Sequence, residues 1–183
     1  MWGDNILNKM LEIIGKSFVL EEIDVNKYSK IKAKGMKFDI KAYYAKGLGH
    51  VSVMTAKGFF GLMKMDTLII NAIEKDLPLY SYDRVNAMGN DTLIVELYDT
   101  VINPSEFEDF DKVNDKYALE HFQAYINTVN GGADVDTKTK QEKASVYVEG
   151  LLKNGGPSTD VFKKALGEEA TAELFRNYLF GTK

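Results

Sequence analysis

The sequence predicts a single α+β domain spanning residues 1–183. One amphipathic helical segment comes first, strand-like segments on short turns follow, and helical segments fill the chain after Pro104. Strands joined by short turns pair antiparallel, because parallel neighbours need long crossover connections. A helix, a meander and then a run of helices is the element order of an α+β domain. A chain of 183 residues is long enough to bury the core of one such domain.

Apolar residues at helical spacing predict the first helix over residues 5–16. In the lysine-rich stretch that follows, the apolar residues have odd numbers up to Ala33 and even numbers from Met36. This change of parity predicts a turn or bulge at Gly35 and a strand over residues 36–45. Further strands are predicted over residues 50–56 and in the stretches GLMKMDTLIINAI, YSYDRVNA and TLIVELYD, with MGND as a hairpin turn.

Four helical segments are predicted in the rest of the chain. The first, over residues 107–130, carries aromatic residues near helical spacing and ends before two glycines. The second covers residues 136–154. The third has Ser158 as its N-cap and Gly167 as its C-terminal stop, and the fourth completes the set over residues 168–181.

Composition narrows the classes of partner and site. The net charge of -4 argues against nucleic acid as the main partner, because phosphate binding favours a basic surface. No apolar run approaches the ~20 residues that span a bilayer, and the N-terminus lacks a signal-peptide pattern, so we expect a cytoplasmic protein with no membrane partner. Cysteine is absent and histidine occurs twice, which argues against disulfides, thiolate metal sites and multi-histidine metal sites.

Asp83 is a candidate site residue because a carboxylate in a strand interior runs against strand propensity. It shares strand parity with small residues, which would leave room for a flat ligand, so Ser81 and Val85 are candidate substrate contacts. A carboxyl group buried in such a pocket has a raised pKa and can donate a proton. The alternative is a solvent-facing or hydrogen-bonded aspartate with a structural role.

Two stretches resemble the ferredoxin-dependent bilin reductases. Asp76-Leu77-Pro78-Leu79 is similar to the bend that precedes the family's catalytic aspartate, a position that Asp83 fills here. The stretch FKKALGEEATAELFRNYLFG, residues 162–181, is similar to the closing pair of helices of the family. The two stretches occur in family order about a hundred residues apart, so the resemblance covers most of the domain.

The resemblance implies a three-layer α/β/α sandwich, with a central antiparallel sheet and C-terminal helices. It also implies a linear tetrapyrrole bound between the sheet and those helices, and its reduction by single electrons from ferredoxin without a bound metal or flavin. Asp83 would be the principal proton donor. The position seventeen residues before it, a histidine in the matching enzymes, is Asp66 in this chain.

Asp66 and His50 are the residues expected to assist Asp83. We expect Asp66 to share the face of Asp83, because the two lie on neighbouring antiparallel strands joined by a short bend, and two carboxylates there can hold one proton between them. The alternative for Asp66 is an ion pair with Lys64 or with a lysine on a neighbouring strand. His50 is the only histidine of the meander, and imidazole shuttles protons near neutral pH. The alternative for His50 is an exposed residue at a strand end.

Seven lysines form a basic block in this acidic protein. Because these lysines alternate along strands, the simplest interpretation is a surface exposed to solvent. The functional alternative is that Lys30, Lys32 and Lys34 steer an acidic electron carrier such as ferredoxin toward the protein. The sequence therefore favours a divergent reductase of a tetrapyrrole or a similar planar ligand. The alternative is a non-catalytic ligand-binding or scaffold protein with the same fold. The block comprises the lysines at positions 27, 30, 32, 34, 37, 41 and 46.

Overall fold

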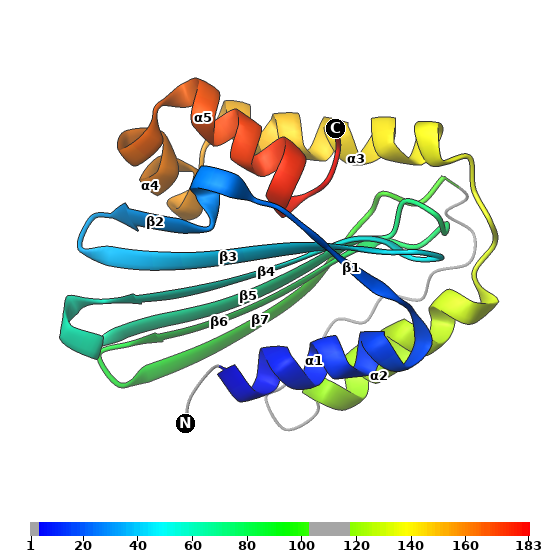
Figure 1. The fold of residues 1–183 in the computed structure, drawn as a ribbon, viewed down its shortest axis with the longest axis horizontal. Coiled ribbons are helices and arrows are strands. Elements are labelled where there is room, and N and C mark those ends of the chain that lie inside the picture. The colour runs from blue at the N-terminus through cyan, green and yellow to red at the C-terminus, as the bar shows by residue number, and fades with distance from the viewer. Residues whose placement is uncertain (1–3, 103–117) are drawn as a thin grey trace.

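A seven-stranded antiparallel sheet separates two layers of helices in the computed structural model, which describes residues 4–102 and 118–183 (Figure 1). Helices α1 and α2 cover one face of the sheet, and the C-terminal helices α3 to α5 cover the other (Figure 1). The predicted α+β class and three-layer sandwich are confirmed.

The predicted meander is confirmed, since β3 to β7 pair with one another in chain order. Strands β1 and β2 both pair with β3, at its two ends, and complete one edge of the sheet. The short β1 was not predicted, because two of its four residues are glutamates and it carries no clear period. The strands are β1 Leu20–Ile23, β2 Lys30–Ala33, β3 Met36–Ala45, β4 Gly49–Gly58, β5 Met63–Asn71, β6 Leu79–Ala87 and β7 Asn90–Tyr98.

The turn predicted at Gly35 joins β2 to β3 and explains the change of parity. Gly35 has φ +74°, in the left-handed region that glycine adopts without steric cost. The predicted MGND hairpin is also present, and Met88 and Gly89 both have positive φ at its centre. Both central residues of a type I′ turn need this conformation, which matches the twist of the flanking strands.

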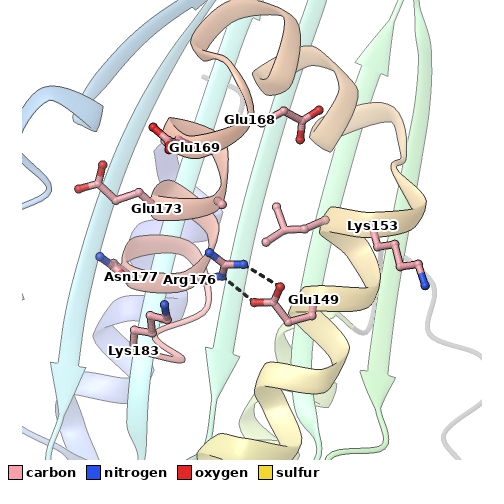
Figure 2. Close-up of a pocket in the computed structure, with 10 residues that line it drawn as sticks. Glu149, Lys153, Glu168, Glu169, Glu173, Arg176, Asn177 and Lys183 are labelled. Carbon is pink, nitrogen blue, oxygen red and sulfur yellow. Dashed lines mark hydrogen bonds and ion pairs between the residues drawn. The ribbon is translucent and has the colours of Figure 1, made fainter.

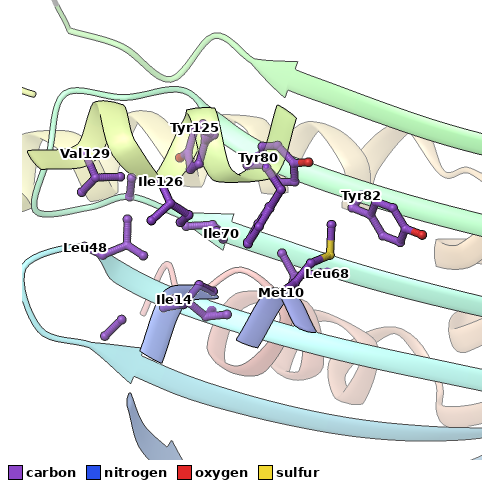
Figure 3. Packing of buried hydrophobic residues seen from close by; sticks show 14 of the residues in the cluster. Met10, Ile14, Leu48, Leu68, Ile70, Tyr80, Tyr82, Tyr125, Ile126 and Val129 are labelled. Atoms are coloured by element: carbon purple, nitrogen blue, oxygen red, sulfur yellow. The ribbon is translucent and has the colours of Figure 1, made fainter. Parts of the chain in front are cut away.

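The N-terminal layer consists of α1 Asp4–Ser17 and α2 Ala118–Gly131. Its core joins apolar side chains of both helices to those on the facing side of β4, β5 and β6 (Figure 3). The prediction of α1 is confirmed. The aromatic residues predicted at the start of the next helix, Phe107 to Tyr117, lie outside the described residues. The labelled side chains are Met10, Ile14, Leu48, Leu68, Ile70, Tyr80, Tyr82, Tyr125, Ile126 and Val129.

The C-terminal layer consists of α3 Thr137–Asn154, α4 Pro157–Leu166, α5 Glu168–Glu173 and the π-helix η5 Leu174–Leu179. The expected stop at Gly167 is confirmed by its φ of +85° at the end of α4. The expected N-cap at Ser158 is wrong. Gly156 is the N-cap and Pro157 opens the helix, because the fixed φ and missing N–H of proline suit the first helical position.

Lys140 ties α3 to the sheet although its side chain is completely buried. Its ammonium group donates to the carbonyl oxygens of Leu77 and Thr100, at 2.6 Å each. The Asp76 carboxylate lies 3.6 Å away, and burial lowers the pKa of Lys140 to about 8 despite that neighbour. One side chain of α3 therefore holds the Asp76-Leu77-Pro78 bend and the residues that follow β7.

We expect Lys140→Met to lower the free energy of unfolding by about 3–5 kcal/mol, the usual effect of removing one partner from a buried ion pair. Urea denaturation monitored by circular dichroism measures this loss. Lys138→Met is the matched control, because Lys138 is exposed on the same helix. A loss for Lys140→Met that equals the loss for the control would contradict this role.

Candidate functional site

Asp83 lies on the face of the sheet that the C-terminal helices cover. Leu79, on the same face of β6, belongs to the core beneath those helices, and alternation along the strand places Ser81, Asp83 and Val85 on the same side. Burial falls along the strand, from Leu79 and Ser81, which are buried, to Asp83 and Val85, which are half-buried. Asp83 thus lies at the boundary between the part of β6 that the helix layer covers and the part that it leaves more exposed.

Two hydroxyl groups hold the Asp83 carboxylate in place. Thr67 on the neighbouring strand β5 donates to Oδ1 at 2.6 Å, and Ser81 donates to Oδ2 at 2.9 Å. Burial nevertheless raises the pKa of Asp83 above its ordinary value; the two hydroxyl groups oppose the shift and the charge of Glu96 adds to it. Asp83 is therefore easier to protonate than an exposed aspartate.

Glu96, Tyr98 and Tyr147 complete the polar group around Asp83. Glu96 lies on β7 opposite Ser81, and its carboxylate accepts a hydrogen bond from the Tyr98 hydroxyl. The rings of Tyr98 and Tyr147 stack at 4.4 Å between centroids, which joins β7 to α3. Burial raises the pKa of Tyr147 to about 12, with smaller contributions from Glu96 and Asp83.

This arrangement suits proton donation to a ligand that lies flat on the sheet. Beyond Asp83 the same face continues with Met63, Met65 and Val85, which are half-buried. A carboxyl group with a raised pKa beside an apolar surface can act as a general acid. Thr67, Glu96, Tyr98 and Tyr147 were not predicted; the register that the short hairpin turn sets between β6 and β7 is a sequence signal that points to Glu96.

Asp66 does not share the face of Asp83, so the expected carboxylate pair is wrong. Thr67 is the strand partner of Asp83, and Asp66 is the partner of Arg84 on the same pair of strands. Neighbouring residues on a strand point to opposite faces, so Asp66 points toward the side of α1 and α2, where it is buried. The carboxylate that lies near Asp83 belongs to Glu96.

His50 is on the same face as Asp83 but far from it. Its strand partner is Asn71, four residues along β5 from the partner of Asp83. Strand geometry then separates the Cα atoms of His50 and Asp83 by about 16 Å, so the two side chains do not meet.

The His50 ring instead supports the end of the C-terminal helix. His50 Nε2 lies 2.9 Å from the carbonyl oxygen of Tyr178. A carbonyl oxygen only accepts, so Nε2 carries a hydrogen and donates it. Burial lowers the pKa of His50 to about 4, which keeps the ring neutral at pH 7.

Two more side chains of the sheet donate hydrogen bonds to the next two carbonyl oxygens of the chain. Ser52 donates to Leu179 at 2.7 Å, and Asn71 donates to Phe180 at 2.8 Å. Gly181 follows with φ +59°, and a Cβ atom there would lie 2.3 Å from the His50 ring. The chain can pass over His50 only because this residue has no side chain.

Two cavities lined by described residues lie away from Asp83. A cavity of about 520 Å³ opens on the outer side of the C-terminal layer, and the Arg176–Glu149 ion pair crosses it (Figure 2). The rest of its charged lining is of mixed sign, with Glu168, Glu169, Glu173, Lys153 and Lys183 (Figure 2). A second cavity, of about 430 Å³, lies beside His50 and the C-terminal residues.

Comparisons with known proteins found a similarity among solved structures. No protein-family model and no curated protein matches the chain. Among solved structures, it is similar to the crystal structure of phytochromobilin synthase from tomato in complex with biliverdin. The TM-score is 0.72 at 12% identity over 97% of this chain and 82% of that chain. The similarity shows a shared fold.

The described residues, 4–102 and 118–183, contain no group of three or more histidine, aspartate and glutamate side chains placed to hold a metal ion. Among the helices of those same residues, none has the length and hydropathy needed to cross a bilayer. Lys30 and Lys32 lie on the face opposite Asp83, because Ile31 and Ala33 between and after them point into the core under the C-terminal helices.

We expect His50 to make stability depend on pH. The unfolded chain takes up a proton as the pH falls through about 6.5, and the folded state does not until about 4, so acid favours unfolding over this window. Between pH 7 and pH 5 this linkage removes about 2 kcal/mol from the free energy of unfolding.

His50→Gln keeps a donor for the Tyr178 carbonyl and does not titrate. Urea denaturation of both proteins at the two pH values should therefore show that the wild type loses about 2 kcal/mol more than the variant. Equal losses in the two proteins would mean that His50 is not buried in its neutral form.

Proposed function

We propose that the protein binds a linear tetrapyrrole, or a similar planar ligand, on the sheet face beside Asp83 and reduces it. The chain would then be a divergent member of the ferredoxin-dependent bilin reductases, the family of phytochromobilin synthase, with residues 1–183 as one domain. The observation that carries the proposal is the Asp83 carboxyl group, held with a raised pKa at the open margin of the face beneath the C-terminal helices.

The surface around Asp83 supports a flat, mostly apolar ligand. Ser81 and Val85, the predicted substrate contacts, flank Asp83 on its own strand, and Met63 and Met65 extend the face onto β5. A tetrapyrrole is planar and apolar over most of its area, so it gains burial on such a face while its ring nitrogens reach a carboxyl group. The tomato enzyme that shares this fold was crystallised with biliverdin, which supports the same ligand class.

In the proposed reaction, Asp83 is the proton donor. Reduction of one carbon–carbon double bond consumes two electrons and two protons. An external carrier would supply the electrons one at a time, and Asp83 would supply a proton, regain one from water at the open margin of the face, and supply the second. The position of Glu96 supports this role, because its negative charge raises the pKa of Asp83 and favours the protonated form.

Binding and chemistry can be tested separately. Titration of the protein with biliverdin should perturb the visible spectrum of the pigment with saturation in the micromolar range. Tyr147→Ala should weaken this binding, because it removes the ring that joins α3 to β7 beside Asp83. An unperturbed biliverdin spectrum would remove the ligand assignment and the function with it.

We expect Asp83→Asn to retain biliverdin binding and to lower turnover with reduced ferredoxin by about 10²–10⁴-fold, the usual contribution of a general acid. Asparagine keeps the shape of the side chain and cannot supply the acid proton. Asp39→Asn is the control, since Asp39 is exposed on β3. Binding without turnover in the wild type would support the alternative of a non-catalytic binding protein.

The acidic electron carrier at Lys30, Lys32 and Lys34 stays a prediction. Reversal of the three charges to glutamate should slow reduction by ferredoxin and flatten its dependence on salt, because screening lengths fall from ~10 Å at 0.1 M to ~3 Å at 1 M. Stopped-flow kinetics over a salt series measures both effects, with biliverdin binding as the control that should not change. Unchanged rates at low salt would identify these lysines as a solvated face.

A further inference from the structure

Large apolar side chains project from two neighbouring turns at one end of the sheet. The β4–β5 turn contains the short helix η2, Phe59–Gly61, and exposes Phe59, Phe60 and Leu62, while the β6–β7 turn exposes Met88. Their exposed fractions run from 51% for Phe59 to 110% for Phe60. Between the two turns lies a hollow of about 320 Å³ with a mostly apolar lining. A soluble monomer gains nothing by placing four such side chains together in water.

The backbone of these turns does not favour the residues that occupy them. Phe59, Phe60 and Met88 have φ values of +50°, +55° and +52°. Asparagine, aspartate or glycine suits this left-handed region, and for a bulky side chain it is an outlier. Strained positions of this kind concentrate where a protein makes functional contacts. The requirements of a turn therefore do not explain why bulky apolar residues occupy these positions, where a positive φ is energetically unfavourable for them.

A row of four lysines crosses the same end of the sheet, behind the β2–β3 turn and the β4–β5 turn. Lys32 pairs with Lys37, Lys37 with Lys57, and Lys57 with Lys64, in register across β2, β3, β4 and β5. Their side chains lie on the face of α1 and α2, opposite Asp83. Like charges on directly opposed strand positions destabilise a sheet. This lysine row places four like charges side by side at one end of a protein whose net charge is -4.

We propose that this end of the sheet docks on the surface of an anionic phospholipid bilayer. The four apolar side chains enter the interface between headgroups and acyl chains, and the lysine row contacts the lipid phosphates and carboxylates. Such docking combines apolar burial with attraction to anionic lipid and requires no membrane-spanning segment. It replaces the expectation of no membrane partner, which rested on the absence of a spanning segment. The proposal does not depend on the proposed reductase activity.

The spacing of the two features matches the layers of a bilayer surface. Lys57 precedes Phe59 by two residues and Lys64 follows Leu62 by two, which places the lysines about 7 Å behind the turn. Apolar side chains at an interface lie about 5–10 Å below the headgroups, so the lysines come to the depth of the charged groups. Asp91, the nearest acidic residue of the β6–β7 hairpin, is paired with Arg84 at 2.5 Å.

Co-sedimentation of the full chain with vesicles tests the proposal. We expect binding to vesicles of equal parts phosphatidylcholine and phosphatidylserine, and at most weak binding to phosphatidylcholine alone. Lys57→Gln combined with Lys64→Gln should weaken the first binding about 25-fold, from about fivefold for each lysine near an anionic surface. Lys138→Gln combined with Lys153→Gln, two exposed lysines of α3, is the matched control and should bind like the wild type.

Insertion of the turns needs its own measurement. We expect Phe59→Ser combined with Phe60→Ser to reduce sedimentation about tenfold or more, given the apolar area of two phenylalanines. A Met88→Trp reporter, made in a chain that also carries Trp2→Phe so that it is the single tryptophan, keeps the turn apolar. Its fluorescence should shift to the blue on vesicles and be quenched by lipids brominated along the acyl chain. The fluorescence of the Met88→Trp variant tests insertion even if the double serine variant folds poorly.

Each of four results would overturn the proposal. The wild type fails to sediment with the anionic vesicles, or the Lys57 and Lys64 variant sediments as well as the wild type, or brominated lipid leaves the Met88→Trp fluorescence unquenched. A dimer in light scattering that dissociates on Phe59→Ser and Phe60→Ser would likewise overturn it, because the turns would then form a contact between copies of the chain.

Discussion

The contact between the end of the C-terminal helix and the centre of the sheet fixes the position of one whole layer. The last carbonyl groups of a helix have no partner within it, and burying them unpaired costs free energy. Here three polar side chains of β4 and β5 donate hydrogen bonds to three successive carbonyl oxygens, those of Tyr178, Leu179 and Phe180. Tyr178 and Leu179 are the last two residues of the π-helix η5, and Phe180 follows it. Because each bond is buried and directional, the layer cannot slide over the sheet without losing all three.

The same constraint explains why the Asp83 face is only partly covered. With the helix end held at His50, the layer covers the half of β6 that begins at Leu79 and leaves the half that ends at Ala87 half-buried. Lys140 fixes the other side of the layer at the bend before β6. Asp83 lies between the covered and open halves. Its carboxylate is buried enough for a raised pKa and remains near a surface that a ligand can reach.

Period and turn signals predicted the strands well, because a strand with one buried face must alternate and a turn must supply positive φ. The segment over residues 36–45 became β3 with the predicted limits, and the parity change at Gly35 located its turn. The faces of the candidate residues were harder to predict. Asp66 was assigned to the face of Asp83 from its place on the neighbouring strand. A shift of one residue in hairpin register moves a side chain to the other face, and the bend between β5 and β6 hides that register from the sequence.

His50 shows a second limit of sequence reasoning. A histidine at a strand end suggests an exposed residue or a proton shuttle, and neither reading includes the carbonyl group of a helix more than a hundred residues away. Such long-range hydrogen bonds leave no local pattern. Gly181 was the nearest available signal, since a glycine after an aromatic helix end allows a close approach, but the sequence does not name what it approaches.

The two ends of the sheet differ in the side chains that they carry and in the direction in which these side chains point. At the end near His50, polar side chains face inward and each meets a backbone partner, so the polar groups stabilise the docking of a layer. At the other end, four lysines stand side by side and four large apolar side chains face outward. Long strand pairing from β3 to β7 allows this, because the continuous ladder of hydrogen bonds holds the open end in place without cover. The lysines and the exposed apolar side chains thus lie where the paired backbone alone holds them in position. Among the described residues no other element covers them, so they stay accessible to an external partner.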